Sequence, residues 1–407
     1  MENSGDRMLG AVVSGSHLIS FEDLPALIAE GAQAFGLDLP LIYVADLQQR
    51  MLMPLPRQQD AFGRPLTPMR IDGSVPGKAF RGQSIVRSNR AFGVHPRRHD
   101  PQRLWLPLLN GAERLGVLGV IIGADTEDVR ERARQLAAVV TLLLASKRSS
   151  SDTYARLTRT ASTTLSAEVT RSLMPPSTFA TGDIVISAAT EPIYEAGGDA
   201  YDYALSGETL HLSIFDSMGH DTAAGLTSTI AMAAGRNARR RGAGLSERAD
   251  EIDEAIAGQF AEQRFATGVL ADVDIGTGMV SWINRAHPAP LVIRRNRHVA
   301  DLDSPPCTPM GFRMERSPPP ARYQLEPGDR LIFYTDGVVE ATDARQERFG
   351  LERFVDFIIR WESDGLSAPE TLRRLVHAVL EYQGDRLDDD ATVLMVEWRA
   401  GTGRLRP

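Results

Sequence analysis

The sequence is poor in features that would cross-link the chain or take it into a membrane. It contains one cysteine, Cys307, so it can form neither an intramolecular disulfide nor a metal site built from several thiolates. Such cysteine usage is typical of a reducing compartment. The longest apolar run, residues 136–145, is far shorter than the ~20 residues of a membrane helix. The first residues also lack the basic and apolar segments of a secretory signal. We therefore expect a cytoplasmic protein without a membrane span.

An excess of positive charge is also missing. The chain carries 53 Asp and Glu against 45 Lys and Arg, which gives a formal net charge of -8. Proteins that bind nucleic acids generally present a basic surface, so the composition argues against a nucleic-acid partner. With 407 residues, of which 43% are hydrophobic, the chain is long enough for two or three globular domains.

Helix and strand patterns divide the chain into two parts that are joined by a helical linker. Residues 15–147 alternate between helical spacing, as in "FEDLPALIAEGAQAFG", and paired strands, as in "LWLPLLN" and "ERLGVLGVIIGA". Within residues 148–178, apolar side chains recur every three to four positions from Tyr154 to Leu173, which predicts one helix. That helix could link the two parts, form a dimer seam or simply pack on the next domain. Residues 179–400 read as many strands interrupted by two pairs of helices, which predicts a layered α+β domain.

Aspartates stand at the ends of several predicted strands in the second part. They are Asp199 in "EAGGDAYDY", Asp216 in "LHLSIFDSMGHD", Asp336 in "DRLIFYTDGVVEA" and Asp389 in "DRLDDDATVLMVEW". No lysine or arginine adjoins any of them. Each one alone would fit a solvated turn. Together they predict an oxygen-only site for a hard cation, Mg²⁺ or Mn²⁺, at one rim of a sheet.

Five motifs in residues 183–399 resemble, in the same order, those of the metal-dependent protein phosphatases of the PPM (protein phosphatase 2C-like) class, in its bacterial SpoIIE-type branch. The motifs are "EAGGDAYDY", "FDSMGHD", "NRAHPAPL", "GDRLIFYTDGVVEA" and "LDDDATVL". The resemblance implies an αββα sandwich, in which two antiparallel sheets are flanked by helix pairs and a two-metal centre lies at one edge. It also implies an enzyme that hydrolyses serine and threonine phosphate esters of proteins.

The resemblance assigns a role to each candidate ligand. Asp216 would bridge both metals, and the Ser217 carbonyl would complete one coordination shell. Asp199 would be reached through the waters of the second metal, whereas Asp336 and Asp389 would hold the first. Two ions, Mn²⁺ or Mg²⁺, ~3.5–4 Å apart, would lower the pKa of a shared water that attacks phosphorus in line.

The other polar residues of these motifs have smaller expected roles. Asp388 and Asp390 would flank the fourth aspartate, either as outer groups of the site or as solvated ones. Asp221 stands where the branch usually has glycine, and an acid at a helix start is favourable at the helix dipole, so we expect a modest effect. His220 and His287 also lie within these motifs, and for His220 packing or capping is favoured over proton transfer.

Residues 15–147 resemble a GAF domain, which implies either small-molecule sensing or a homodimer contact. The resemblance of the second part implies that the substrate is a phosphorylated regulator, such as a STAS-type anti-sigma-factor antagonist, with the helix at residues 154–173 coupling the two parts. Two alternatives remain open. The second part could be an interaction module with little or no catalysis, or the GAF-like part could bind the functional ligand while the second part only relays it.

Overall fold

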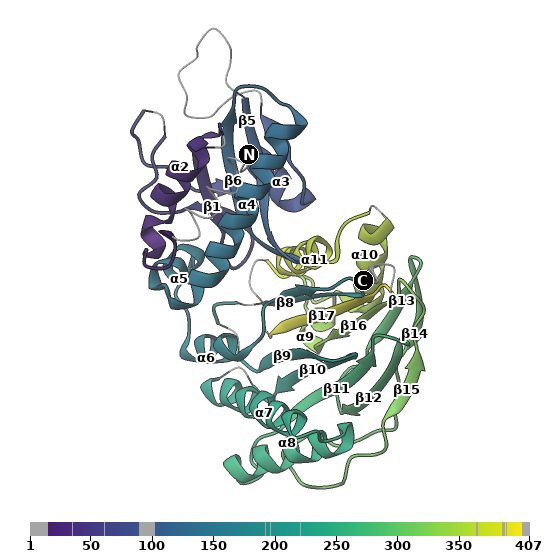
Figure 1. The fold of residues 1–407 in the computed structure, drawn as a ribbon. Coiled ribbons are helices and arrows are strands. Elements are labelled where there is room, and N and C mark those ends of the chain that lie inside the picture. The colour runs from purple at the N-terminus through teal and green to yellow at the C-terminus, as the bar shows by residue number, and fades with distance from the viewer. Residues whose placement is uncertain are drawn as a thin grey trace. The chain divides into compact units, whose positions relative to one another are not determined.

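The structure is a computed structural model that divides into two compact units, Met1–Ala161 and Ser162–Pro407 (Figure 1). It describes residues 15–34, 36–60, 62–88, 102–191, 193–195, 197–219, 221–363, 365–384, 387 and 389–400. Among the helices of these ranges, none has the length and apolar character that crossing a membrane requires.

The N-terminal unit is built around a six-stranded antiparallel sheet with the order β3-β2-β1-β6-β5-β4. Its elements are α2 (Leu24–Ala34), β1 (Asp38–Ala45), β2 (Met51–Pro54), β3 (Met69–Arg70), α3 (Val75–Gly82), β4 (Val86–Ser88), β5 (Gln102–Asn110), β6 (Glu113–Ile122) and α4 (Glu127–Lys147). Helices α2 and α4 share a core with one face of the sheet, and α3 packs Phe80 against Tyr43 and Trp105 on the other face. The predicted first helix and the paired strands β5 and β6 are confirmed.

The single helix predicted from Tyr154 to Leu173 is wrong. The chain forms two short helices there, α5 (Asp152–Thr158) and α6 (Leu165–Leu173), and the division between the two units falls between them. The hydroxyl of Thr164 caps α6 by accepting from the N–H of Ala167 (3.2 Å). The intervening "TASTT" is rich in hydroxyl side chains, which compete with helical hydrogen bonds and favour caps. The periodic apolar stripe is therefore interrupted, and Leu165 is 68% exposed.

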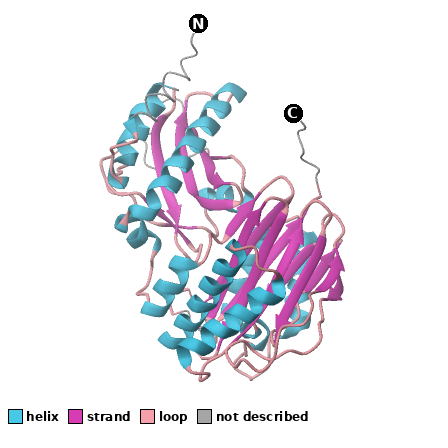
Figure 2. Ribbon diagram, turned by 60° about the horizontal axis from the view of Figure 1, so that its bottom comes forward, coloured by secondary structure: helices cyan, strands magenta, loops and turns pink. Residues whose placement is uncertain are grey.

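The C-terminal unit is an αββα sandwich, as Figure 2 shows in its central strands and flanking helices. One sheet has the order β15-β12-β11-β10-β9 and the other has the order β14-β13-β16-β17-β8-β7. The strands are β7 (Thr178–Ala180), β8 (Ile184–Glu191), β9 (Asp199–Ser206), β10 (Thr209–Ser217), β11 (Ala266–Asp274), β12 (Met279–Arg285), β13 (Leu291–Arg294), β14 (Arg297–Asp301), β15 (Ala321–Gln324), β16 (Arg330–Tyr334) and β17 (Ala391–Trp398). The helices are α7 (Thr222–Arg240), α8 (Leu245–Phe260), α9 (Asp336–Glu340), α10 (Gly350–Ser363) and α11 (Ala368–Tyr382).

Alternation along the strands fixes which side chains enter which layer. In β10, Leu212 and Ile214 join the core between the two sheets, whereas Phe215 joins the core beneath α7 and α8. This period of two is the geometry of a pleated strand. The central strands are covered on both faces, and the predicted acids stand at their ends.

Candidate metal centre

The first two predicted ligands lie opposite each other on neighbouring strands. Asp199 begins β9, Asp216 lies one residue before the end of β10, and the antiparallel register pairs them directly. Directly paired residues point to the same face of a sheet, with Cβ atoms about 4.5–5.5 Å apart. The β9–β10 pair therefore brings two carboxylates together at one end of the five-stranded sheet.

The other two predicted ligands lie at the ends of neighbouring strands in the six-stranded sheet. Asp336 follows β16 and begins α9, whereas Asp389 precedes β17 and is exposed. Strands β16 and β17 are antiparallel, and their register pairs Tyr334 with Val393. The end of one strand and the start of the other consequently meet at the same end of this sheet.

Two threonines connect these sheet ends to each other. The Thr335 hydroxyl donates to the Asp199 carboxylate (2.7 Å) and accepts from the backbone N–H of Thr392 (2.9 Å). Thr335 is fully buried and directly precedes Asp336 in sequence. The acids of the two sheets therefore share one edge of the sandwich, and Thr335 orients the most deeply buried of them.

Asp390 makes the second connection between the sheets. Its carboxylate accepts from the backbone N–H groups of Gly197 (2.8 Å) and Gly198 (2.6 Å), and it is only 5% exposed. Of the two roles that the sequence left open for Asp390, the structure shows the buried one, in which this side chain holds the glycine loop before β9. Asp388 lies outside the described residues.

The backbone of Ser217, whose carbonyl is a predicted ligand, packs closely against that glycine loop. A Cβ atom on Gly198 would lie 2.3 Å from the Ser217 carbonyl oxygen, so only glycine fits at this position. The Ser217 N–H donates to the Gly198 carbonyl (3.2 Å). From α7, the Ser228 hydroxyl contacts the Ser217 hydroxyl (2.6 Å) and also donates to the Gly198 carbonyl.

The electrostatics of this edge are those of uncompensated negative charge. Burial, followed by the negative charges of Asp336, Asp389 and Asp390, raises the pKa of Asp216 to about 7. Burial and the charge of Asp216 likewise raise the pKa of Asp199 well above its ordinary value. Burial and the charge of Asp389 raise the pKa of Asp336. Within the described ranges, no lysine or arginine forms an ion pair with any of the four predicted carboxylate ligands.

The donor chemistry fits a hard divalent cation. The edge offers carboxylate and carbonyl oxygens, which are the ligands that Mg²⁺ and Mn²⁺ prefer. Among the described residues, no three His, Cys, Asp or Glu side chains are gathered as a ready-made metal cage. Mg²⁺ commonly binds through one or two carboxylates and keeps several waters, so it needs no such cage. Asp199, Asp216, Asp336, Asp389 and the Ser217 carbonyl are thus the groups available to hold ions here.

The remaining motif residues lie beside this edge in structural roles. Asp221 caps α7 by accepting from the N–H of Ala224 (2.8 Å), as expected for an acid at a helix start. Nδ1 of His287 lies 2.8 Å from the Thr267 hydroxyl, and burial lowers the pKa of His287 to about 3, which keeps the ring neutral. His220 lies outside the described residues.

Sequence reasoning missed Thr335 and left the role of Asp390 open. The one available signal for Thr335 was a hydroxyl residue between an apolar strand and an acid, in "IFYTDG". In the sequence only the resemblance separated Asp389 from Asp390, because they are chemically identical neighbours, and the structure shows that Asp389 is exposed and Asp390 is buried.

Comparisons with known proteins find relatives of the C-terminal part of the chain. Residues 206–399 match the model of the family described as Stage II sporulation protein E (SpoIIE). The chain is similar to "Phosphoserine phosphatase RsbU" of Bacillus subtilis (strain 168), with 21% identity over 214 residues, which are 52% of this chain and 62% of RsbU. The chain thus covers less than two thirds of the length of this curated relative.

Solved structures of bacterial proteins are also similar to this chain. The structure of the RsbU and RsbW domains of Rv1364c from Mycobacterium tuberculosis has 24% identity and a TM-score of 0.47, over 54% of this chain and 63% of that one. The SiaA-PP2C domain of Pseudomonas aeruginosa has 20% identity and a TM-score of 0.48, over 57% of this chain and 94% of that one. The family match and the relative in Bacillus thus show that the C-terminal unit of this chain is similar to SpoIIE/PP2C-type phosphatase domains.

Proposed function

We propose that the C-terminal domain is a metal-dependent protein phosphatase that hydrolyses phosphoserine and phosphothreonine. Its ligands for two Mn²⁺ or Mg²⁺ ions are Asp199, Asp216, Asp336, Asp389 and the Ser217 carbonyl. The observation that carries this proposal is the meeting of these acids at one edge of the sandwich, where no lysine or arginine of the described residues forms an ion pair with them. Three of them, Asp199, Asp216 and Asp336, are desolvated and have raised pKa values, which is characteristic of functional sites.

The residues of this edge hold and orient the groups that the reaction needs. Thr335 fixes the Asp199 carboxylate, and Asp390 fixes the glycine loop that lies against the Ser217 carbonyl. Divalent ions bound there would supply an activated water and neutralise the phosphate oxygens. His287 is buried, its Nδ1 contacts the Thr267 hydroxyl, and burial lowers its pKa, which favours a packing role.

The proposed substrate is a phosphorylated regulatory protein, and we favour a STAS-type anti-sigma-factor antagonist. Support comes from the relative in Bacillus subtilis, which is named as a phosphoserine phosphatase. The SpoIIE family match covers the part of the chain that contains Asp216, Ser217, Asp336 and Asp389.

We propose that the N-terminal unit controls this activity, as a sensor, as a homodimer contact or as both. We also propose that the protein is cytoplasmic. The N-terminal unit contains a cavity of about 260 Å³ lined by α2, the start of β1 and residues 57–59, which would suit a small-molecule signal. After the division between the units, α6 contacts the site loop, because the Ser166 hydroxyl donates to the Gly197 carbonyl (3.4 Å). A shift of α6 would therefore reach the loop that Asp390 holds.

The test is an assay of the purified full chain on a generic phosphate ester and a phosphoserine protein, with Mn²⁺, with Mg²⁺ and with chelator. We expect metal-dependent release of phosphate, which the Asp216→Asn variant loses. Turnover without metal, or full turnover by this variant, would contradict the proposal. Absence of turnover in both the full chain and residues 150–407 would favour an interaction module, whereas turnover by residues 150–407 alone would show that the N-terminal unit holds the enzyme inactive.

A further inference from the structure

One arginine outside the recognised motifs contacts the loop that follows Asp216. Arg264 lies just before β11, and its guanidinium donates to the Met218 carbonyl (3.1 Å). The same group donates to both carboxylate oxygens of Asp221, at 3.1 Å and 2.8 Å. Arg264 therefore holds this loop at two points, one before and one after Gly219, which has a φ of +85°. Such planar, bidentate pairing is specific to arginine.

The partner of Arg264 is the acid that departs from the motif. Asp221 stands where the resemblance leads us to expect glycine, which has no side chain that could accept from Arg264. The Asp221 carboxylate also caps α7 through the N–H of Ala224. One side chain thus joins the start of α7 to an arginine 43 residues away.

The backbone beside Arg264 is fixed from the other side. The Phe265 carbonyl accepts from the N–H of Met218 (3.1 Å), and the Phe265 ring packs on Phe312 with centroids 5.3 Å apart. A Cβ atom on Gly311 would lie 2.4 Å from the Arg264 carbonyl oxygen, which shows how closely the two segments pack.

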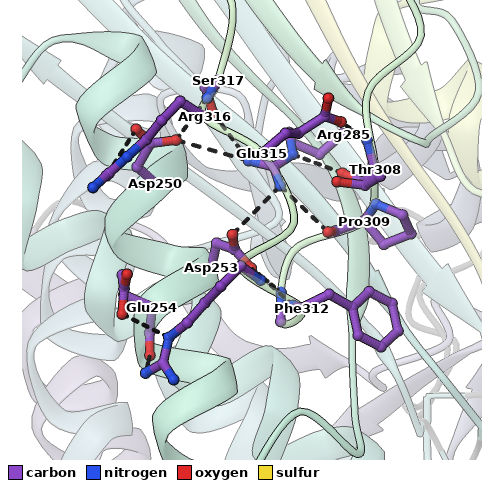
Figure 3. A network of polar contacts seen from close by, with 12 residues as sticks. Asp250, Asp253, Glu254, Arg285, Thr308, Pro309, Phe312, Glu315, Arg316 and Ser317 are labelled. Atoms are coloured by element: carbon purple, nitrogen blue, oxygen red, sulfur yellow. Dashed lines mark hydrogen bonds and ion pairs between the residues drawn. The ribbon is translucent and has the colours of Figure 1, made fainter.

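The segment that carries Phe312 is itself anchored to the helix layer. Figure 3 shows Asp253 of α8 and Arg285 of β12 reaching into this segment. The Asp253 carboxylate accepts from the N–H of Phe312 (2.9 Å), and the buried Arg285 donates to the Thr308 carbonyl (2.7 Å). The backbone that carries Arg264 is therefore held in place, and the Arg264 side chain extends from it to the loop that follows Asp216.

We infer that Arg264 is a positioning residue that, through Asp221 and the Met218 carbonyl, holds the Ser217–Met218 peptide where the Ser217 carbonyl can bind a metal ion. The inference rests on the proposed function, in which the Ser217 carbonyl is a metal ligand. The pair contributes little to the stability of the fold, since the Asp221 side chain is 57% exposed and ion pairs at that exposure are weak.

The experiment measures Mn²⁺ binding to the full chain by isothermal titration calorimetry, with Asp216→Asn as the blank for sites elsewhere. The variants are Arg264→Ala, Asp221→Ser, which keeps a helix cap but removes the carboxylate, and the double variant. We expect each single variant to weaken Mn²⁺ binding about tenfold, as the loss of groups that support metal ligands does. The double variant is expected to bind no more weakly than either single one, because both break the same contact.

Arg313→Ala is the matched control. Arg313 lies on the same anchored segment, but its guanidinium pairs with Glu254 (2.7 Å) on α8. The Arg313→Ala substitution should leave Mn²⁺ affinity within about twofold of the wild type. Neither this control nor the Arg264 and Asp221 variants should shift the unfolding temperature by more than about 2 °C.

Three results would overturn the inference. They are unchanged Mn²⁺ affinity in both single variants, additive losses in the double variant, and a fall in unfolding temperature that accounts for the weaker binding. If the wild type binds Mn²⁺ and turns over substrate while the variants match it, the inference alone falls. If the wild type neither binds Mn²⁺ nor shows metal-dependent turnover, the proposed function is wrong, and the inference that rests on it is wrong as well.

Discussion

Two sets of acidic side chains in the C-terminal domain have opposite surroundings. Four acids of the domain that lie largely out of solvent meet arginines. They are Asp202 with Arg236 (2.7 Å) and Arg239 (3.0 Å), Asp253 with Arg285 (3.6 Å), Asp272 with Arg248 (2.6 Å) and Asp329 with Arg294 (2.7 Å). Within the described residues, the rim acids, by contrast, form no ion pair with a lysine or arginine, and they meet one another, hydroxyl groups and backbone N–H groups. They are Asp199, Asp216, Asp336, Asp389 and Asp390.

The difference separates acids whose burial is offset by an arginine from acids whose burial is not. An ion pair offsets the cost of taking a carboxylate out of water. A paired acid therefore destabilises the fold only when its partner is removed. An unpaired buried acid keeps that cost, and its pKa rises. Retaining several such acids at one edge makes sense if a cation from solution supplies the missing charge.

The largest expected effect comes from removing one rim acid. Asp216→Asn should lower metal-dependent phosphatase activity by more than about 100-fold, which exceeds the usual effect of losing a supporting group. Without metal, its unfolding temperature should equal or exceed that of the wild type, because one desolvated charge is gone. Phosphate release and thermal unfolding measure the two effects.

Asp272→Asn is the matched variant from the paired set, assayed well below its unfolding temperature. It should keep most of its activity while losing stability. If both variants behaved alike in both measurements, the division into two sets would be wrong.

The second prediction removes the arginine from a paired acid. Arg285→Ala should lower the free energy of unfolding of the C-terminal domain by about 3–5 kcal/mol, because it leaves buried acceptors and Asp253 without their cation. Arg285 is fully buried and donates to the Thr308 carbonyl and the Ser317 hydroxyl (2.9 Å). Chemical denaturation gives the value.

Arg316→Ala is the control from the same network in Figure 3. Arg316 is 82% exposed and lies 3.4 Å from Asp250, so its loss should change stability by less than about 1 kcal/mol. Equal effects of the two substitutions would show that burial does not determine how much these pairs contribute to the free energy of unfolding.

The third prediction concerns Asp390, the rim acid that holds backbone rather than metal. Asp390→Ala should destabilise the domain by about 1–3 kcal/mol, because the N–H groups of Gly197 and Gly198 lose their acceptor. Asp390→Asn keeps an oxygen acceptor and should lose less. Hydrogen exchange of the two glycine amides reports the loop directly, and equal exchange in both variants would contradict the assigned role.

The smallest expected effect is a pH dependence of stability. Burial alone would raise the pKa of Asp272, but its hydrogen bonds with His211 and Arg248 lower that pKa overall. Its stabilisation is therefore fully present above the unfolded-state pKa of about 3.9 and is lost as pH falls through the lower folded-state value.

Below about pH 4, the wild type should lose stability more steeply than Asp272→Asn. Denaturation curves of the wild type and the variant, recorded from pH 2.5 to pH 6 in metal-free buffer at about 25 °C, measure the difference. Parallel curves would show that Asp272 titrates alike in the folded and unfolded states.

Local pattern was enough to predict much of the fold. Strand β17 has a near-continuous apolar sequence because both of its faces are covered, and the helices α7, α8, α10 and α11 form the two predicted pairs. The positions of the candidate ligands could also be found, because strand ends and their acids are adjacent in sequence. Their roles as metal ligands remain a prediction.

The rest depends on contacts between distant residues. Nothing in the sequence near Asp221 shows that Arg264 pairs with it, and nothing near Thr335 shows that it donates to Asp199. The break between α5 and α6 was missed because apolar spacing continued across it, while the cap at Thr164 ended the preceding segment. Periodicity records which residues could share a face, whereas capping determines where a helix begins.

The contact between Asp390 and the glycine loop also sets an order of assembly during synthesis. Asp390 and Gly197 are 193 residues apart, so the loop is made long before the side chain that holds it. At the usual rate of translation this delay is on the order of 10–40 s. For most of that time Asp199 and Asp216 have been made, but Asp389, Asp390 and the strand β17 do not yet exist. A nascent chain therefore cannot display the complete edge until β17 has been made.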